Sequence, residues 1–309
     1  MNRTGPGLLV NLAVIFAAIL TLIYIIVRIA VFLSYGYPPV DRIFACLLIA
    51  GEFFVLIHSL GYVINLFKVF TAKDKREEAG RASEILTSPA QPEVAVLVTA
   101  RHEPREVLRS TFSAINALNY KNKQVFFLDD SSEETYRKEA QELAQELALS
   151  LFRSGSRHGA KAGIINDCLK TLSQKYVVLF DADQNPLPEF LGTLVSLMER
   201  DGKLAFIQTP QFYSNIGASR VAKASTFQQS VFYEYICEGK SVSDAMFCCG
   251  TNVIFRLAAL KEVGGLDEVS VTEDFATSVK LHIKGWRSLF YPHTYTFGMG
   301  PENLQEYFK

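Results

Sequence analysis

Two aspartates, Asp181 and Asp183, stand one residue apart directly after an unbroken apolar run over residues 176–180. Such a run predicts a strand buried on both faces, as in a parallel sheet, where ligands bind beyond the carboxyl ends of the strands. In extended backbone the two carboxylates point to the same side, so they can share one hard divalent cation and the oxygens of a diphosphate. Because aspartate also favours turns, a plain strand-to-turn junction is the alternative.

Two further acidic pairs follow predicted strands or loops. Asp129 and Asp130 come after the strand predicted over residues 124–128, at the same sheet edge, where a carboxylate can bind a nucleobase or a ribose. An Asx turn or a helix cap is the alternative there. Asp274 falls in the first turn of a helix that Thr272 is expected to cap. The helix dipole keeps such a carboxylate ionised and able to take a proton from a hydroxyl, although an ordinary N-terminal acid fits as well.

Lys161 lies among small residues in the segment GAKAG (159–163), at a predicted helix start. A helix start of this kind can bring backbone N–H groups and a cation to a phosphate together. The chain has neither the G-x-G-x-x-G nor the G-x-x-x-x-G-K-[ST] pattern, so a dinucleotide oxidoreductase or a P-loop ATPase is not supported. Its formal net charge of −1 gives no case for a nucleic-acid partner either.

Strands and helices alternate over the middle of the chain, which predicts right-handed βαβ units and an α/β domain with a mainly parallel sheet. Strands are predicted over residues 94–99, 124–128, 149–153, 176–180 and 204–208, and helices over 104–118, 133–148, 161–172 and 188–200. The later part is less regular. It predicts a helix over 219–238, a short strand over 253–255, helices over 257–263 and from 272 onward, and a last helix beginning near Glu302.

Two apolar runs lie near the amino terminus, over residues 8–33 and 43–67, with a Tyr-Pro-Pro turn between them. Each run is long enough to span a bilayer, and a secretory signal would have a shorter apolar core. We therefore expect two transmembrane helices. Glu52 and His58 are expected to face a neighbouring helix or a water molecule, and Arg28 to extend toward the membrane interface.

Basic residues gather after the second apolar run, and by the positive-inside tendency that side is cytosolic. They are Lys68, Lys73, Lys75, Arg76 and Arg81. We therefore expect a juxtamembrane linker over residues 68–92 and a cytosolic domain over residues 93–309, in a multi-pass protein of the inner (plasma) membrane. The five cysteines include no C-x-x-C pair, so neither a disulfide framework nor a zinc site is expected.

Taken in order, short segments of the cytosolic part resemble the processive family 2 glycosyltransferases, most closely the bacterial cellulose synthase type. The matching segments are TARHEP (99–104), LDD (128–130), AKAG (160–163), DAD (181–183), QTP (208–210), FCCGT (247–251) and TED (272–274). Each is weak alone, and together they cover nearly the whole cytosolic part at spacings like those of the family.

The resemblance implies a GT-A (Rossmann-like) fold, a UDP-sugar donor and Mg²⁺ or Mn²⁺ as cofactor. It implies that Asp274 is the base that deprotonates the acceptor hydroxyl, and that Asp181 and Asp183 hold the metal. Residues implied to bind the nucleotide sugar are Thr99, Arg101, Glu103, Asp129, Asp130, Lys161 and Asp181. Residues implied to bind the acceptor are Phe247, Cys249, Gly250 and Glu273.

The sequence departs from the family pattern at several of these segments. Arg101 and His102 replace an aromatic residue and an asparagine, Gly159 and Ile164 replace the residues that usually flank the AKAG segment, and Cys248 replaces a phenylalanine. The Q-x-x-R-W segment that follows TED in the family, and the channel helices beyond it, do not occur before Lys309. We therefore expect an amino-terminal fragment whose glycosyltransferase domain is incomplete at its C-terminus.

The function predicted from these features is inverting transfer of a hexose from a UDP-sugar, UDP-glucose first, to a growing β-linked polysaccharide at the membrane. The partners expected are the donor, a polysaccharide or lipid acceptor, membrane lipid and accessory subunits of a synthase complex, with no nucleic acid. The alternatives are a polysaccharide synthase that uses UDP-N-acetylglucosamine, a lipid glycosyltransferase, and a catalytically incompetent module that only binds a UDP-sugar.

Overall fold

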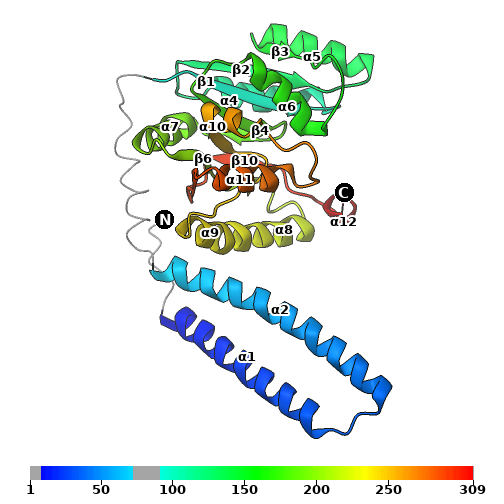
Figure 1. Cartoon of the computed structure of the whole chain (residues 1–309). Coiled ribbons are helices and arrows are strands. Elements are labelled where there is room, and N and C mark those ends of the chain that lie inside the picture. Colours follow the sequence, from blue (N-terminus) through cyan, green and yellow to red (C-terminus); the bar gives the residue numbers. More distant parts are fainter. Residues whose placement is uncertain (1–7, 72–90, 309) are drawn as a thin grey trace. The chain divides into compact units, whose positions relative to one another are not determined.

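The computed structural model describes residues 8–71 and 91–308, and the chain divides into compact units over Met1–Asp74 and Lys75–Lys309 (Figure 1). Most of the predicted linker over residues 68–92 lies outside the described residues, as do the basic side chains predicted to set the orientation.

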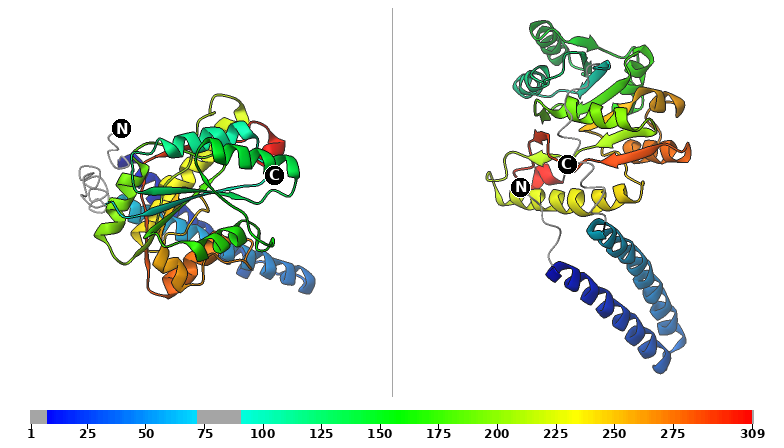
Figure 2. Two further views of the ribbon diagram at one scale, coloured as in Figure 1. Left: turned by 90° about the horizontal axis from the view of Figure 1, so that it is seen from above. Right: turned by 90° about the vertical axis from the view of Figure 1, so that its left-hand side faces the viewer.

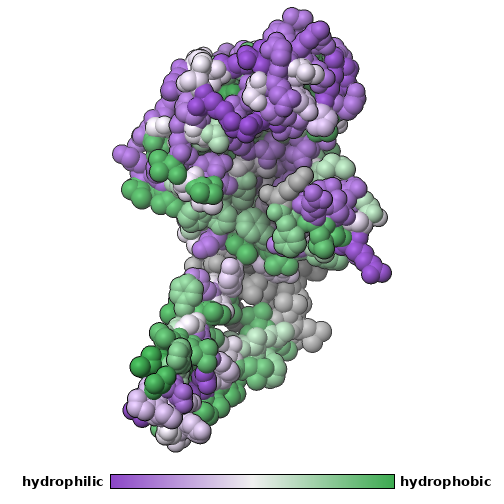
Figure 3. Space-filling model, turned by 90° about the vertical axis from the view of Figure 1, so that its right-hand side faces the viewer, coloured by the Kyte–Doolittle hydropathy of each residue, from purple (hydrophilic) through white to green (hydrophobic). Residues whose placement is uncertain are grey.

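The first unit contains helices α1 (Leu8–Ser34) and α2 (Pro39–Thr71). The stretches Leu12–Ser34 and Pro39–Ile64 are long and apolar enough to cross a membrane, as length and composition predicted. The second helix starts four residues before the predicted apolar run, because Pro39 fits the first turn of a helix, where its missing N–H is not needed. Most of the hairpin surface is apolar, whereas much of the surface of the second unit is hydrophilic (Figure 3).

Arg28 and Glu52 pair with each other across the hairpin, with Arg28 Nε 2.9 Å from Glu52 Oε2. This corrects the expectation that Arg28 extends toward the membrane interface on its own. Glu52 does face the neighbouring helix, as one of the expectations had it. His58 instead bonds within its own helix, with Nδ1 2.8 Å from the carbonyl oxygen of Phe54. An apolar medium favours both arrangements, because an unpaired charge or polar group there is costly.

In the second unit, the described strands form a seven-stranded sheet in the order β3-β2-β1-β4-β8-β6-β9. Its strands are β1 (Val94–Ala100), β2 (Lys123–Asp129), β3 (Ser150–Phe152), β4 (Tyr176–Asp181), β6 (Leu204–Gln208), β8 (Val253–Arg256) and β9 (Arg287–Phe290). Only β8 among them runs antiparallel to its neighbours, β4 and β6. The predicted mainly parallel sheet is therefore confirmed.

Helices cover both faces of this sheet (Figure 2). They are α4 (Arg105–Asn116), α5 (Glu134–Glu146), α6 (Ala160–Thr171), α7 (Phe190–Arg200), α10 (Leu257–Glu262) and α11 (Glu273–Ile283). Strand β4 contributes Val178 and Phe180 to the core shared with α4, α5 and α7. It contributes Val177 and Leu179 to the core shared with α6 and α10. The apolar run before Asp181 is thus buried on both faces, as predicted.

The later part holds elements that the sequence pattern did not indicate. The predicted helix over residues 219–238 is α8 (Arg220–Val231), a π-helical segment (Phe232–Cys237) and α9 (Glu238–Val242). A small second sheet joins β5 (Asn185–Pro186), β10 (Thr296–Gly298) and β7 (Phe212–Tyr213). Strands of two or three residues are too short to give a periodic signal. Helix α12 (Leu304–Tyr307) is the last described element.

Candidate functional site

The ends of neighbouring parallel strands place the predicted donor residues together. In register, Thr99 of β1 lies beside Asp181 of β4, and Ala100 beside Asp129 of β2. A cavity of about 500 Å³, which we call the donor cavity, opens at this edge. Its lining includes every residue predicted for donor or metal binding except Asp129, namely Thr99, Arg101, Glu103, Asp130, Lys161, Asp181 and Asp183.

Asp129 is buried instead, and its carboxylate organises the loop after β2. Its Oδ2 accepts a hydrogen bond from Arg153 Nε at 2.7 Å, and its Oδ1 accepts from Ser131 N at 3.1 Å. Asp130, the next residue, faces the cavity and pairs with Arg157 Nε at 3.2 Å. Arg157 was not predicted from the sequence, and it adds a third cation to the cavity beside Arg101 and Lys161. Only one feature of the sequence indicated Arg157, namely that it is a basic residue shortly before the AKAG segment.

The loop after β1 is fixed by its own polar groups. His102 has a left-handed backbone (φ 64°), and its ring Nε2 accepts a hydrogen bond from Ser132 N at 3.0 Å. The ring also lies against Tyr136, with centroids 4.9 Å apart. The Glu103 carboxylate accepts from the Arg101 N–H. Burial raises the pKa of Glu103, backbone N–H groups oppose that shift, and the nearby Asp181 charge adds to it.

Lys161 lies at the meeting point of β4, α6 and the FCCGT segment. Its Nζ pairs with Asp181 Oδ1 and donates to the carbonyl oxygen of Gly250 at 2.9 Å. Burial is the largest single influence and opposes the charged form, but the charge and the hydrogen bond of Asp181, together with other nearby groups, outweigh it and raise the pKa of Lys161. Before it, Gly159 and Ala160 are both left-handed, with φ values of 56° and 48°. This turn directs the start of α6, and with it Lys161, toward the donor cavity.

The carboxylates of Asp181 and Asp183 can hold a hard divalent cation only if a bound diphosphate supplies further oxygen ligands. Asp181 Oδ1 is engaged by Lys161, and Asp183 Oδ1 accepts from Gln184 Nε2 at 3.1 Å. Over residues 8–71 and 91–308, no group of three or more His, Cys, Asp or Glu side chains could hold a metal by itself. Mg²⁺ is commonly held by one or two carboxylates plus substrate phosphates, and these two carboxylates match that pattern.

A second cavity of about 1130 Å³, which we call the acceptor groove, contains Asp274 in its lining. Aromatic and amide side chains make up much of the rest: Gln211, Tyr213, Gln228, Gln229, Phe232, Tyr233, Phe247, Phe275 and Tyr307. Phe247 lies between Phe232 and Phe275, with ring centroids 6.0 Å and 5.6 Å away. Phe275 was missed by the sequence analysis, although it directly follows the predicted base. Of the predicted acceptor residues, Phe247 and Cys249 line the groove, whereas Gly250 and Glu273 do not.

Gly250 lies between a residue that lines the acceptor groove, Asp274, and one that lines the donor cavity, Lys161. A Cβ added at this glycine would lie 3.5 Å from Asp274 Oδ2 and 3.9 Å from Lys161 Nζ. The predicted base and the predicted phosphate-binding lysine therefore flank one backbone position. Gly250 is left-handed (φ 77°), a conformation that favours glycine.

Buried hydrogen bonds hold the FCCGT segment in place. Gln208, from the QTP segment, is fully buried, and its Oε1 accepts from Cys249 N at 2.8 Å while its Nε2 donates to Thr251 O at 2.8 Å. Ser278 Oγ of α11 accepts from Cys248 N at 2.7 Å. Cys248 is only 2% exposed, so the residue that departs from the family pattern packs into the core.

Asp274 lies in the first turn of α11, and its Oδ1 accepts from Phe275 N at 2.7 Å. Its other oxygen is the one nearest to Gly250. Thr272 occupies the N-cap position, but its side chain makes no capping hydrogen bond, which corrects the predicted cap.

Comparison with known proteins gives consistent results. Residues 91–309 match the family model "Glycosyltransferase like family 2". The catalytic subunit of a UDP-forming cellulose synthase from Pseudomonas fluorescens is 29% identical over 99% of this chain and 41% of the relative. Cellulose synthase 2 from Novacetimonas hansenii is 29% identical over 98% of this chain and 18% of the relative. The chain therefore spans less than half the length of these relatives.

A mannosyltransferase from Pyrobaculum calidifontis, solved with GDP-Man and Mn²⁺, superposes with a TM-score of 0.54 at 18% identity. The superposition covers 78% of this chain and 69% of that one. At this identity the likeness establishes the fold alone, and it confirms the predicted GT-A fold.

Proposed function

The chain belongs to family 2 of the glycosyltransferases, close to the cellulose synthases, and on that premise we propose that it transfers a hexose from a UDP-sugar, UDP-glucose first, to a growing β-linked polysaccharide. The observation that carries this proposal is the junction at Gly250. There a charged cavity suited to a nucleoside diphosphate adjoins an aromatic groove suited to a sugar chain, with Lys161 on one side and Asp274 on the other.

On the donor side, Thr99, Arg101, Glu103 and Asp130 would contact the uracil and ribose, and Lys161 would contact the diphosphate. Asp129 would act indirectly, by holding the loop that presents Asp130. Asp181 and Asp183 would hold Mg²⁺ or Mn²⁺, which when bound neutralises charge on the departing diphosphate.

On the acceptor side, Asp274 would take the proton from the attacking hydroxyl at Oδ2, the oxygen left free by the Phe275 N–H. The hydroxyl oxygen would form the new bond to the anomeric carbon while the bond from that carbon to UDP breaks. Attack from the face opposite UDP would invert the anomeric configuration. The chain end would be bordered by Phe247, Cys249 and Gly250. Glu273 lies outside the groove lining and would influence acceptor binding only through its neighbour Asp274.

The hairpin of α1 and α2 would anchor the chain in the inner (plasma) membrane, with the second unit in the cytosol. The ion pair between Arg28 and Glu52 supports close packing of the two helices in lipid, because it satisfies both charges. The partners of this unit would be the UDP-sugar, a polysaccharide or lipid acceptor, membrane lipid and accessory subunits of a synthase complex.

Release of UDP by membranes that contain the chain tests the proposal. UDP-glucose, UDP-N-acetylglucosamine and other UDP-sugars are compared, with Asp183→Ala as the inactive control. Glu134→Gln, which changes an exposed carboxylate on α5 outside both cavities, is the matched active control. We expect release with UDP-glucose that Asp183→Ala abolishes and Glu134→Gln retains. Donor-independent release, or none with any UDP-sugar, would contradict the proposal.

A further inference from the structure

Two adjacent residues, Asp267 and Glu268, connect the helix that carries Lys161 to the helix that carries Asp274. Asp267 bonds to α11: its Oδ2 lies 2.6 Å from Lys280 Nζ, and its N–H donates to Thr277 Oγ1 at 2.8 Å. Glu268 faces α6 instead. The loop over residues 266–272 is therefore attached at neighbouring positions to both helices, and it leads directly into the TED segment.

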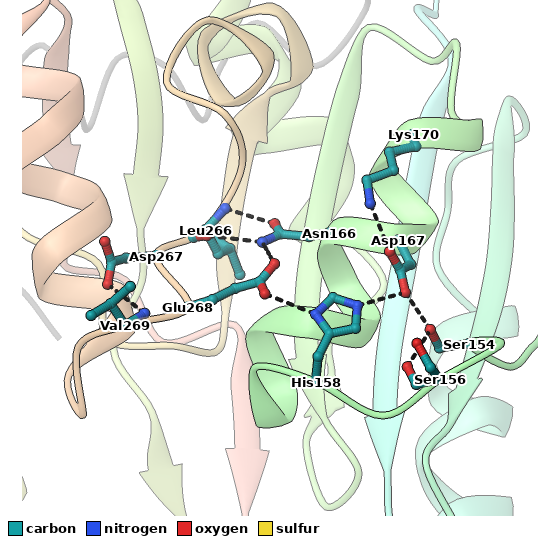
Figure 4. Close-up of polar contacts among 10 residues, drawn as sticks. All are labelled: Ser154, Ser156, His158, Asn166, Asp167, Lys170, Leu266, Asp267, Glu268 and Val269. Carbon is teal, nitrogen blue, oxygen red and sulfur yellow. Dashed lines mark hydrogen bonds and ion pairs between the residues drawn. The ribbon is translucent and has the colours of Figure 1, made fainter.

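His158 is the centre of the attachment to α6 (Figure 4). Its Nδ1 lies 2.8 Å from Glu268 Oε2, and its Nε2 lies 2.9 Å from Asp167 Oδ2. A neutral imidazole donates through only one nitrogen, whereas both nitrogens of His158 face carboxylates. The geometry is therefore satisfied in full only by the imidazolium form, in which both nitrogens donate.

Asn166 of α6 completes the attachment. Its Nδ2 donates to Glu268 Oε1 at 2.6 Å and to the carbonyl oxygen of Leu266 at 2.9 Å, and its Oδ1 accepts from Leu266 N at 2.7 Å. Asp167 is also bonded by Ser154 Oγ and by Lys170 Nζ, the latter at 2.8 Å. We call His158, Asn166, Asp167 and Glu268 the clasp.

Glycines allow the clasp to close. A Cβ at Gly159 would lie 2.7 Å from Glu268 Oε2, and one at Gly265 would lie 2.3 Å from Asn166 Oδ1. Both glycines have positive φ values, 56° and 93°. Side chains at these positions would push the loop away from α6, so the close contact is specified by the local sequence on both sides.

We propose that His158 is a positioning residue that, as an imidazolium, holds the 266–272 loop against α6 and so fixes Asp274 relative to Lys161. The consequence for sugar transfer rests on the proposed function, whereas the clasp itself does not. His158 itself lines neither cavity, so it acts through the loop.

The inference implies a defined pH dependence. The charged groups that face His158 are Asp167, with Lys170 behind it, from α6 and Glu268 from the loop. Hydrogen bonds to Asp167 and Glu268 raise the pKa of His158 from its ordinary value of 6.5, and burial opposes them only in part. The clasp is therefore complete below pH 6.5 and loosens as the pH rises through the raised pKa.

Hydrogen exchange of the 266–272 amides, measured on the full chain in detergent and corrected for intrinsic rates, tests the clasp without any activity. We expect protection about two- to fivefold higher near pH 6 than near pH 8.5, the size of one partly exposed ion pair. His158→Gln should lose this difference, because glutamine carries no titrating charge. Lys170→Gln, which removes the other cation on Asp167, should keep it.

Protection that does not change with pH in the wild type, or that changes equally in His158→Gln, would overturn the inference. In the UDP-release assay, His158→Gln should lower kcat about two- to fivefold near pH 6, flatten the pH profile and leave the donor KM unchanged. A raised donor KM with unchanged kcat would also contradict the positioning role. If the wild type releases no UDP, the proposed function fails, while the exchange result still decides the clasp.

Discussion

The donor cavity and the acceptor groove come together near Gly250, but the side chains that line them differ in kind. In the donor cavity two ion pairs are already made within the protein, Lys161 with Asp181 and Asp130 with Arg157. In the acceptor groove aromatic rings and amides predominate beside Asp274. A diphosphate that enters this cavity would therefore have to exchange ion-pair partners, whereas a neutral sugar chain in the groove would stack and hydrogen-bond. Donor binding should depend on charge and metal, and acceptor binding on aromatic surface.

Replacement of Lys161 is expected to give the largest loss on the donor side. Lys161→Met removes the cation while roughly keeping the side-chain volume, and it leaves the Asp181 carboxylate without its partner. Asp181 is 40% exposed, so the main loss is the contact of the ammonium with the diphosphate. A hydrogen bond to a charged group contributes about 1.5–3 kcal/mol, so UDP affinity should fall by about 10- to 100-fold. Titration with UDP measures this loss, and Lys161→Arg should recover part of it. Unchanged UDP affinity in Lys161→Met would show that the diphosphate binds elsewhere.

Asp183→Ala tests whether UDP binding in the donor cavity depends on a metal ion held by Asp183. If Asp183 helps to hold the cation, the variant should bind UDP equally well with and without Mn²⁺, whereas the wild type should bind more tightly with Mn²⁺. Calorimetric titration under both conditions makes the comparison. Retention of the full Mn²⁺ effect by the variant would remove Asp183 from the metal site.

Gly250→Ala perturbs the junction itself. Its Cβ would contact Asp274 Oδ2 and Lys161 Nζ at ordinary van der Waals distances, so the main cost is the left-handed backbone. That cost is about 1–2 kcal/mol for an alanine. We expect a lower free energy of unfolding by that amount and a fall in kcat that exceeds any change in UDP affinity. Chemical denaturation and UDP titration measure the two effects, and an unchanged kcat would place the reaction away from Gly250.

Phe275→Ala should give the smallest effect and only on the acceptor side. The ring borders Phe247 in the groove, and such contacts are worth about 0.5–1.5 kcal/mol. The KM for the acceptor should therefore rise about two- to tenfold, with UDP affinity unchanged. Phe227→Ala, which removes an exposed ring of α8 outside the groove lining, is the matched control. A loss of UDP affinity in Phe275→Ala would contradict the assignment of donor and acceptor binding to two separate regions.

The place of the donor cavity was predictable from the sequence because one rule brings the strand ends together, whereas Thr99, Arg101 and Glu103 were named only by the family resemblance. Carboxyl ends of parallel strands meet at one edge, and the apolar runs located those ends to within a residue or two. The rule did not distinguish Asp129 from Asp130, because Asp129 is the last residue of β2 and its buried carboxylate pairs with Arg153. The direction of a side chain at a strand end depends on the turn that follows, which sequence spacing does not specify.

The acceptor groove and the clasp were harder to predict because they depend on contacts between distant segments. His158 and Glu268 are separated by 110 positions, and Arg28 and Glu52 by 24. Phe232, Phe247 and Phe275 come from three segments whose packing joins them. Hydrophobic periodicity locates helices and strands, but it contains no information on which helix ends meet. Only the family resemblance named Phe247, whereas Asp274 was also indicated by its place in the first turn of a predicted helix. The rings beside them became evident only in the folded structure.

The most direct test of the central claim, that the donor cavity and the acceptor groove cooperate through Asp274, compares sugar transfer with UDP binding in Asp274→Asn. This change keeps the shape of the side chain and removes its basicity, and general-base catalysis contributes about 10²–10⁴-fold to a rate. We predict that UDP release from the best donor falls by that factor while UDP affinity stays within about twofold of the wild type. Equal release by both proteins, or a matching loss of UDP affinity, would contradict the account.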